Sequence, residues 1–164
     1  MLLIETMDEK KKVLIICTGN SCRSQMAEGF LNSFGDEMEV FSAGTRPEKE
    51  VNPIAIKVMA ECDIDISSHT PKPVDKFIDR EWEFVITVCG GANADCPVFS
   101  GKVKQRMHIG FDDPAAARGT EEQKLEVYRR IRDEIEEAFY SFYLAFVSPR
   151  AESGGCGCGC GCSN

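Results

Sequence analysis

The sequence predicts an α/β fold, a three-layer sandwich around a short four-stranded parallel sheet. Apolar runs of strand length alternate along the chain with stretches whose apolar residues recur at helical spacing. The runs at 13–16 and 84–88 carry almost no polar residue, which is typical of parallel strands covered on both faces. In such folds the ligand site lies at the carboxyl ends of the strands.

In chain order we expect strands at 13–17, 38–42, 84–88 and 105–109, and helices at 26–34, 53–62, 74–80 and 120–146. Asn52 and Pro53 mark the start of the second helix, because asparagine caps helices and proline suits their first position. Cys62 continues the apolar face of that helix, so we expect it in the core. His69 lies in a loop, where a histidine more often forms a hydrogen bond than acts as a catalyst.

The last predicted helix is long and amphipathic. Its apolar residues recur at helical spacing and are Leu125, Tyr128, Ile131, Ile135, Phe139, Phe142 and Phe146. We interpret this aromatic stripe as core packing.

At 164 residues, the chain has the length of one domain. We expect a flexible lead-in at 1–11, a catalytic α/β domain at 12–149 and a disordered Gly/Cys-rich tail at 150–164. The net charge of −8 argues against nucleic acid and anionic membranes as partners. The apolar run near the start is too short for a signal peptide, so we expect a cytoplasmic protein. There, its nine cysteines would be reactive or metal-binding rather than disulfide-bonded. Separately, we expect a monomer.

Cys17 and Arg23 stand between the first strand and the first helix. The turn at 18–24 directs backbone N–H groups toward the amino end of that helix, a position that attracts oxyanions. The guanidinium of Arg23 can add two parallel hydrogen bonds to a tetrahedral anion. We expect the helix end and Arg23 to lower the pKa of Cys17 and to hold it as the nucleophilic thiolate. The pattern predicts thiol chemistry on phosphate-like anions.

Further cysteines follow the third strand. Cys89 ends this strand, and a segment of small residues leads to Cys96, with six residues between the two thiols. This spacing does not fit a zinc site, so a mobile redox loop is the favoured interpretation and two unrelated cysteines are the alternative. The tail carries a thiol at every second position, at Cys156, Cys158, Cys160 and Cys162. Such a tail is a candidate soft-metal site, with a solvated tail of adventitious metal affinity as the alternative.

Several motifs occur in a fixed order along residues 12–147. They are CTGNSCRSQMAEG at 17–29, Ser42-Ala43-Gly44, Asp63-Ile64-Asp65-Ile66-Ser67, Cys89 with Cys96-Pro97, and Gly110-Phe111-Asp112-Asp113-Pro114-Ala115. Together they resemble the thioredoxin-coupled arsenate reductases, which share the fold of the low-molecular-weight tyrosine phosphatases. The ordered set is more specific than any single motif.

The resemblance implies a three-cysteine relay that reduces arsenate to arsenite for arsenic detoxification. Cys17 attacks arsenate held by the loop and Arg23, while Asp113 protonates the departing oxygen as general acid. Cys89 then attacks Cys17, which releases arsenite and leaves a disulfide. Cys96 attacks Cys89 in turn and moves the disulfide to the loop, where thioredoxin reduces it.

The implied oxyanion-binding loop comprises Thr18, Gly19, Asn20, Ser21, Cys22, Arg23 and Ser24. Within it, Asn20 and Ser24 would shape the loop and stabilise the thiolate, whereas Cys22 has no required role. No organic cofactor is expected, because two thiols that become one disulfide supply both electrons.

Some members of the family bind potassium near the loop. The corresponding residues would be Asn20, Glu28, Ser42 and an acid shortly after the His-Thr pair, and that last position is Lys72 here. A cation stands where a cation ligand would be. We therefore expect no functional potassium site, with Lys72 replacing the charge of the ion.

Two other functions remain open. A low-molecular-weight protein tyrosine phosphatase would use Cys17, Arg23 and Asp113 identically, but would regenerate Cys17 by hydrolysis. The phenyl ring of a phosphotyrosine substrate would lack an aromatic side chain to pack against, because Ala115 and Ala116 follow the Asp-Pro pair. A non-catalytic arsenite- or soft-metal-binding protein would rely on the cysteine-rich tail instead.

Overall fold

The computed structural model describes residues 10–89 and 99–148. Its strands are β1 (Lys11–Cys17), β2 (Met38–Gly44), β3 (Trp82–Thr87) and β4 (Val103–His108). Its α-helices are α1 (Arg23–Phe34), α2 (Pro53–Ala60) and α3 (Glu121–Phe142), and the short turns are η1 (Val74–Lys76), η2 (Pro114–Ala116) and η3 (Tyr143–Val147). None of the helices in these described ranges is both long and apolar enough to cross a membrane.

The four strands form one parallel sheet in the order β2-β1-β3-β4. The chain therefore leaves β1 toward β2 on one side and returns to β3 on the other. This reversal of strand order creates a crevice at the carboxyl end of β1, where α/β folds bind their ligands. Cys17 is the last residue of β1 and is paired with Gly44 at the end of β2.

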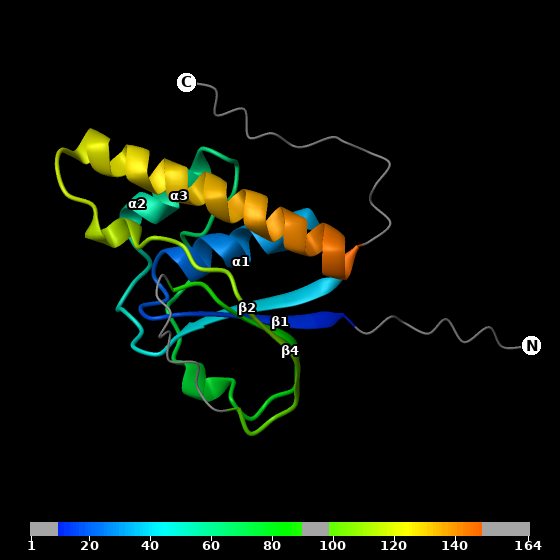
Figure 1. The fold of residues 1–164 in the computed structure, drawn as a ribbon. Coiled ribbons are helices and arrows are strands. Elements are labelled where there is room, and N and C mark those ends of the chain that lie inside the picture. The colour runs from blue at the N-terminus through cyan, green and yellow to red at the C-terminus, as the bar shows by residue number, and fades with distance from the viewer. Residues whose placement is uncertain (1–9, 90–98, 149–164) are drawn as a thin grey trace, which may run out of the picture.

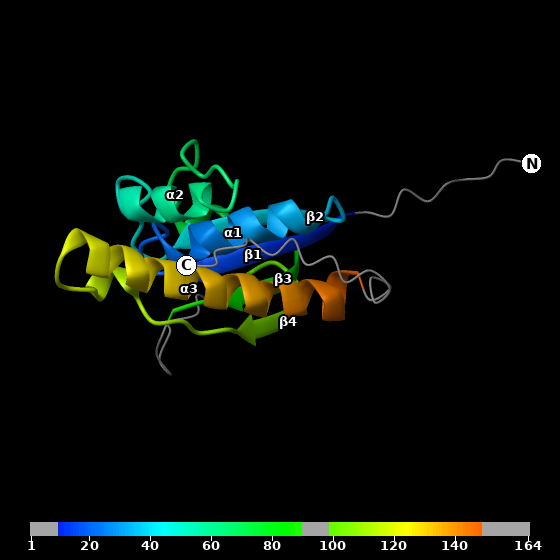
Figure 2. The same cartoon turned by 90° about the horizontal axis from the view of Figure 1, so that it is seen from above.

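Three layers result, which confirms the predicted fold class. All three α-helices cover one face of the sheet, with α3 packed against α1 and α2 (Figures 1 and 2). On the other face, the segment around η1 forms a thinner layer (Figure 1). Alternate residues of β1 enter two separate cores, Val13 on the helix side and Leu14 on the η1 side, and both are fully buried. This explains why residues 13–16 of β1 are all apolar.

Several predicted elements differ in detail from the structure. The helix expected at 74–80 shrinks to the single turn η1, because Phe77 packs against Phe41 and Trp82, and its carbonyl accepts a hydrogen bond from Trp82 Nε1. The prediction that Cys62 is a core residue was wrong, since it lies beyond the end of α2 and is only half-buried. Phe146, expected in the core, is 38% exposed on the π-helical turn η3.

Candidate active site

The loop after β1 wraps around the sulfur of Cys17. This side chain is 3% exposed. Its Sγ accepts a hydrogen bond from the backbone N–H of Asn20 at 3.0 Å and lies 2.8 Å from the Ser24 hydroxyl. The loop runs directly into α1, which begins at Arg23. The sulfur therefore stands where loop and helix N–H groups favour negative charge.

Asn20 holds the loop in its bend. Its φ of 52° is in the left-handed region, which asparagine tolerates better than most residues. The buried side chain donates from Nδ2 to Ser24 Oγ at 2.8 Å. Its Oδ1 accepts the Lys72 backbone N–H at 2.9 Å and Gln25 Nε2 at 3.1 Å. Gly44 closes the other side, since a Cβ there would stand 2.5 Å from the Thr18 carbonyl oxygen.

Burial governs the titration of Cys17. Desolvation raises the pKa of its thiol above the ordinary value, while the hydrogen bonds from Ser24 and Asn20 act in the opposite direction. The lowered pKa expected from the sequence was therefore wrong, because burial outweighs these contacts. The sequence also predicts that Arg23 lowers the pKa of Cys17. In the structure the Arg23 guanidinium contacts the Phe111 carbonyl and Asp113 instead of the thiol.

Arg23 and Asp113 lie together beside the loop. Arg23 Nη1 donates to the Phe111 carbonyl at 3.1 Å, and Nη2 is 3.8 Å from Asp113 Oδ2. The Asp113 side chain is half exposed and caps η2 by accepting the Ala115 backbone N–H at 3.0 Å. Asp113 is thus an acid with solvent access beside the guanidinium, a position that suits proton transfer to a bound oxyanion.

The second predicted thiol reaches the same loop. Cys89, two residues after β3, is half-buried, and its Sγ is 3.5 Å from the Thr18 hydroxyl. The structure thus brings together Cys17, Arg23, Asp113 and Cys89. Cys96 and the tail cysteines, Cys156, Cys158, Cys160 and Cys162, lie outside the described residues.

Cys22 belongs to the loop, and its side chain packs against Tyr128 of α3. It is 5% exposed, and its Sγ is 3.8 Å from the Tyr128 hydroxyl. Burial raises the pKa of its thiol to about 11, so Cys22 stays protonated at neutral pH and is a poor nucleophile. Its environment is that of a packed thiol.

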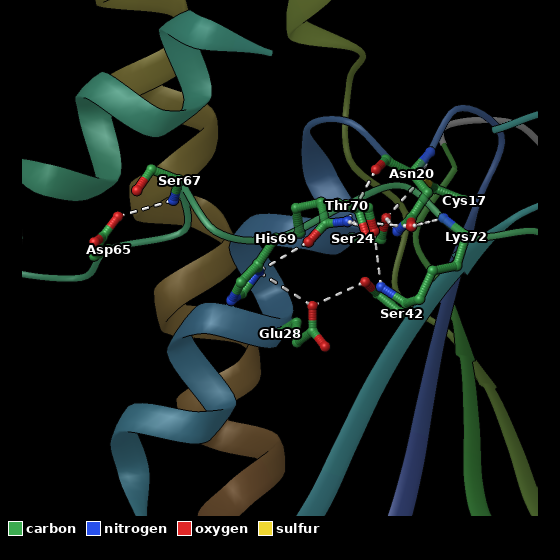
Figure 3. A network of polar contacts seen from close by, with 11 residues as sticks. Cys17, Asn20, Ser24, Glu28, Ser42, Asp65, Ser67, His69, Thr70 and Lys72 are labelled. Atoms are coloured by element: carbon green, nitrogen blue, oxygen red, sulfur yellow. Dashed lines mark hydrogen bonds and ion pairs between the residues drawn. The ribbon is translucent and has the colours of Figure 1, made fainter. Parts of the chain in front are cut away.

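A second polar network supports the loop from behind (Figure 3). Glu28 of α1 accepts a hydrogen bond from Ser42 at 3.0 Å and lies 3.4 Å from His69 Nδ1. His69 also hydrogen-bonds to Gln25 at 3.0 Å, in agreement with the hydrogen-bonding role expected for it. Sequence reasoning missed Gln25, although its position directly after the loop was a usable signal. Within residues 10–89 and 99–148, no group of three or more His, Cys, Asp and Glu could hold a metal ion.

The chain is similar in sequence and in structure to known proteins. The family model of the low molecular weight phosphotyrosine protein phosphatases matches residues 12–149. An arsenate reductase of Halalkalibacterium halodurans is 48% identical over 134 residues, which are 81% of this chain and 95% of that protein. A solved arsenate reductase in the phosphate-binding state has a TM-score of 0.67 and 35% identity, covering 80% of this chain and 95% of that one. A thioredoxin-dependent arsenate reductase of Corynebacterium glutamicum has a TM-score of 0.56 and 28% identity, covering 82% and 63%, respectively.

Proposed function

The chain belongs to the low molecular weight phosphotyrosine protein phosphatase family, and from this premise we propose that it is an arsenate reductase. The proposal draws on the arsenate reductase of H. halodurans, 48% identical over nearly its whole length, and on the solved arsenate reductases that share the fold. Arsenate and phosphate are tetrahedral oxyanions of similar shape, so one anion-binding loop suits both.

The first step joins Cys17 to arsenic. Burial raises the pKa of Cys17, whereas the hydrogen bonds from Ser24 and Asn20 stabilise the thiolate that attacks. The overall reactants are the thiol and hydrogenarsenate. As the sulfur attacks arsenic, the thiol proton and the hydroxyl of arsenate leave together as water, with Asp113 passing the proton to the departing oxygen. Arg23 and the loop N–H groups bind the remaining oxygens. Hydrogenarsenate and one thiol thus give a thiol-bound arsenic(V) and one water.

The second step reduces arsenic. Cys89 attacks the sulfur of Cys17, the sulfur–arsenic bond breaks, and its electron pair stays on arsenic, which leaves as arsenite and takes protons from solvent. Two thiols have then become one disulfide and have supplied both electrons. Cys96 next attacks Cys89 and restores the Cys17 thiol, which leaves a Cys89–Cys96 disulfide for thioredoxin to reduce.

One observation carries the choice of a reductase: the Cys89 sulfur lies 3.5 Å from the hydroxyl of a residue of the anion-binding loop, Thr18. A phosphatase returns its nucleophile by hydrolysis and has no use for a second thiol at that position. The thioredoxin dependence of the C. glutamicum protein favours thioredoxin as the reductant here. Free thiols and thioredoxin chemistry favour the cytoplasm as the place of action.

The test is turnover by the full-length protein. With arsenate, thioredoxin, thioredoxin reductase and NADPH, we expect arsenite in large excess over protein. Cys17→Ser should abolish this, and Cys96→Ser should stop the reaction after about one arsenite per protein. Cys62→Ser, which removes a thiol outside the relay, serves as the matched control.

Other outcomes separate the alternatives. A reduced protein that forms no arsenite from arsenate but binds added arsenite would be a non-catalytic binder. Rapid hydrolysis of an aryl phosphate that persists unchanged in Cys89→Ser, without arsenite formation, would indicate a phosphatase. Normal cycling of Cys96→Ser with thioredoxin would remove Cys96 from the mechanism.

A further inference from the structure

Glu28 is a carboxylate enclosed behind the anion-binding loop. It is 9% exposed on the sheet-facing side of α1, where Ser42 Oγ donates to Oε2 at 3.0 Å. Burial raises the pKa of Glu28, whereas the positive charges of Lys72 and His69 lower it. A buried carboxylate needs a counter-charge to remain ionised, and His69 supplies a full charge only when it is protonated.

Lys72 contacts the surroundings of this carboxylate in two ways. Its backbone N–H donates to Asn20 Oδ1 at 2.9 Å, and its ammonium donates to the Thr70 carbonyl at 3.0 Å. Figure 3 shows the side chain folded back toward Ser42 and the Glu28 carboxylate. The same residue therefore fixes the loop through its main chain, and its side chain places a permanent positive charge near Glu28. The ion pair of Glu28 is with His69 at 3.4 Å, so Lys72 acts on the carboxylate from a longer range.

The residues do not fit a bound potassium ion, which the resemblance to the arsenate reductases implies for some members. A monovalent cation needs free oxygen ligands, but Asn20 Oδ1 already accepts two hydrogen bonds, from Lys72 and Gln25. The Thr70 carbonyl accepts the Lys72 ammonium. A potassium ion at this place would also lie close to the Lys72 ammonium. Two neighbouring positive charges repel each other strongly in a partly buried site.

We propose that the Lys72 ammonium is a built-in counter-ion for Glu28, which makes the shape of the anion-binding loop independent of potassium. The ammonium is linked to the nucleophile through side chains. It shares the Thr70 carbonyl with Gln25 Nε2, and Gln25 Nε2 also donates to Asn20 Oδ1 at 3.1 Å. Asn20 Nδ2 then donates to Ser24 Oγ at 2.8 Å, and Ser24 Oγ lies 2.8 Å from Cys17 Sγ. Lys72 is thus a positioning residue and touches no reacting atom. The inference concerns the loop itself and holds whether the protein reduces arsenate or hydrolyses phosphate esters.

The test compares cations without any turnover, so its failure is distinct from failure of the proposed reaction. The full-length protein is studied in KCl, NaCl and choline chloride at equal concentration. Thermal unfolding reports the packing of the loop, and alkylation of Cys17 by iodoacetamide, followed by site-resolved mass spectrometry, reports its thiolate. For the wild type we expect the same midpoint and the same Cys17 rate in all three salts. A midpoint that rises in KCl over NaCl in the wild type would overturn the proposal.

Variants at Lys72 sharpen the result. Lys72→Ala should slow Cys17 alkylation about fivefold, the effect of a shift below one pKa unit, and Lys72→Arg should restore the wild-type rate. Lys72→Asp restores an acid at this position, so its unfolding midpoint should become higher in KCl than in NaCl. The control is Lys76→Ala, at an exposed lysine of η1, which should match the wild type in every salt. Equal Cys17 rates in Lys72→Ala and the wild type would contradict the proposed role.

Discussion

Removal of the Ser24 hydroxyl tests how the loop controls its nucleophile. Ser24 Oγ lies 2.8 Å from Cys17 Sγ, is buried, and makes the largest contribution that lowers the pKa of Cys17 against the effect of burial. A hydrogen bond to a charged group contributes about 1.5–3 kcal/mol. Its loss from the thiolate in Ser24→Ala should therefore raise the pKa of Cys17 by about one to two further units.

The assay is the rate of Cys17 alkylation as a function of pH. Below the pKa the rate follows the thiolate fraction, so Ser24→Ala should react about 10- to 100-fold more slowly than the wild type. Ser33→Ala is the matched control, because Ser33 is on the same helix and hydrogen-bonds to the Phe30 carbonyl, far from the thiol. Superimposable profiles for Ser24→Ala and the wild type would refute the reasoning and assign thiolate control to the backbone N–H groups alone.

Three further predictions follow from the same structure. Asp113→Asn should slow arsenite formation in a single turnover by about 10²- to 10⁴-fold, with Asp112→Asn as control, and an unimpaired Asp113→Asn would assign the proton transfer elsewhere. Burial raises the pKa of Cys22 from 9.0 to about 11, so the unfolded chain releases this proton first as the pH rises. The free energy of unfolding should fall by up to about 2.7 kcal/mol from this thiol between about pH 9 and 11. In urea titrations, the free energy of unfolding of Cys22→Ala should fall less between these pH values than that of the wild type. An equal fall in both proteins would contradict the role of Cys22. Deletion of residues 151–164, outside the described ranges, should leave single-turnover reduction intact but remove tight arsenite or soft-metal binding by the reduced protein, and an unchanged titration would leave the tail without this role.

The fold was predictable because its signals are local. The unbroken apolar run at 13–16 predicts a strand covered on both faces, and Val13 and Leu14 do enter two different cores. Asn52 caps α2 by accepting the Ile54 N–H, and Thr120 forms a capping box with Gln123 at the start of α3. Such contacts span two or three residues and can be recognised in the sequence.

The remaining details depend on tertiary contacts. Lys72 reaches Asn20 across 52 positions of sequence, so no local pattern could show that its backbone shapes the loop. The raised pKa of Cys17 follows from burial, which the helix-end argument leaves out. The helix expected at 74–80 failed because Phe77 packs against aromatic residues of β2 and β3. In each case packing outweighed the local preference.

The most direct measurement is a single turnover without any external reductant. The full-length reduced protein is mixed with excess arsenate, and arsenite, free thiols and disulfide-linked peptides are determined together. The relay predicts about one arsenite and the loss of two thiols per protein, with the disulfide joining Cys89 and Cys96 and with Cys17 free again. Arsenite formed with every thiol retained, or a final disulfide that excludes Cys89, would contradict the proposed mechanism.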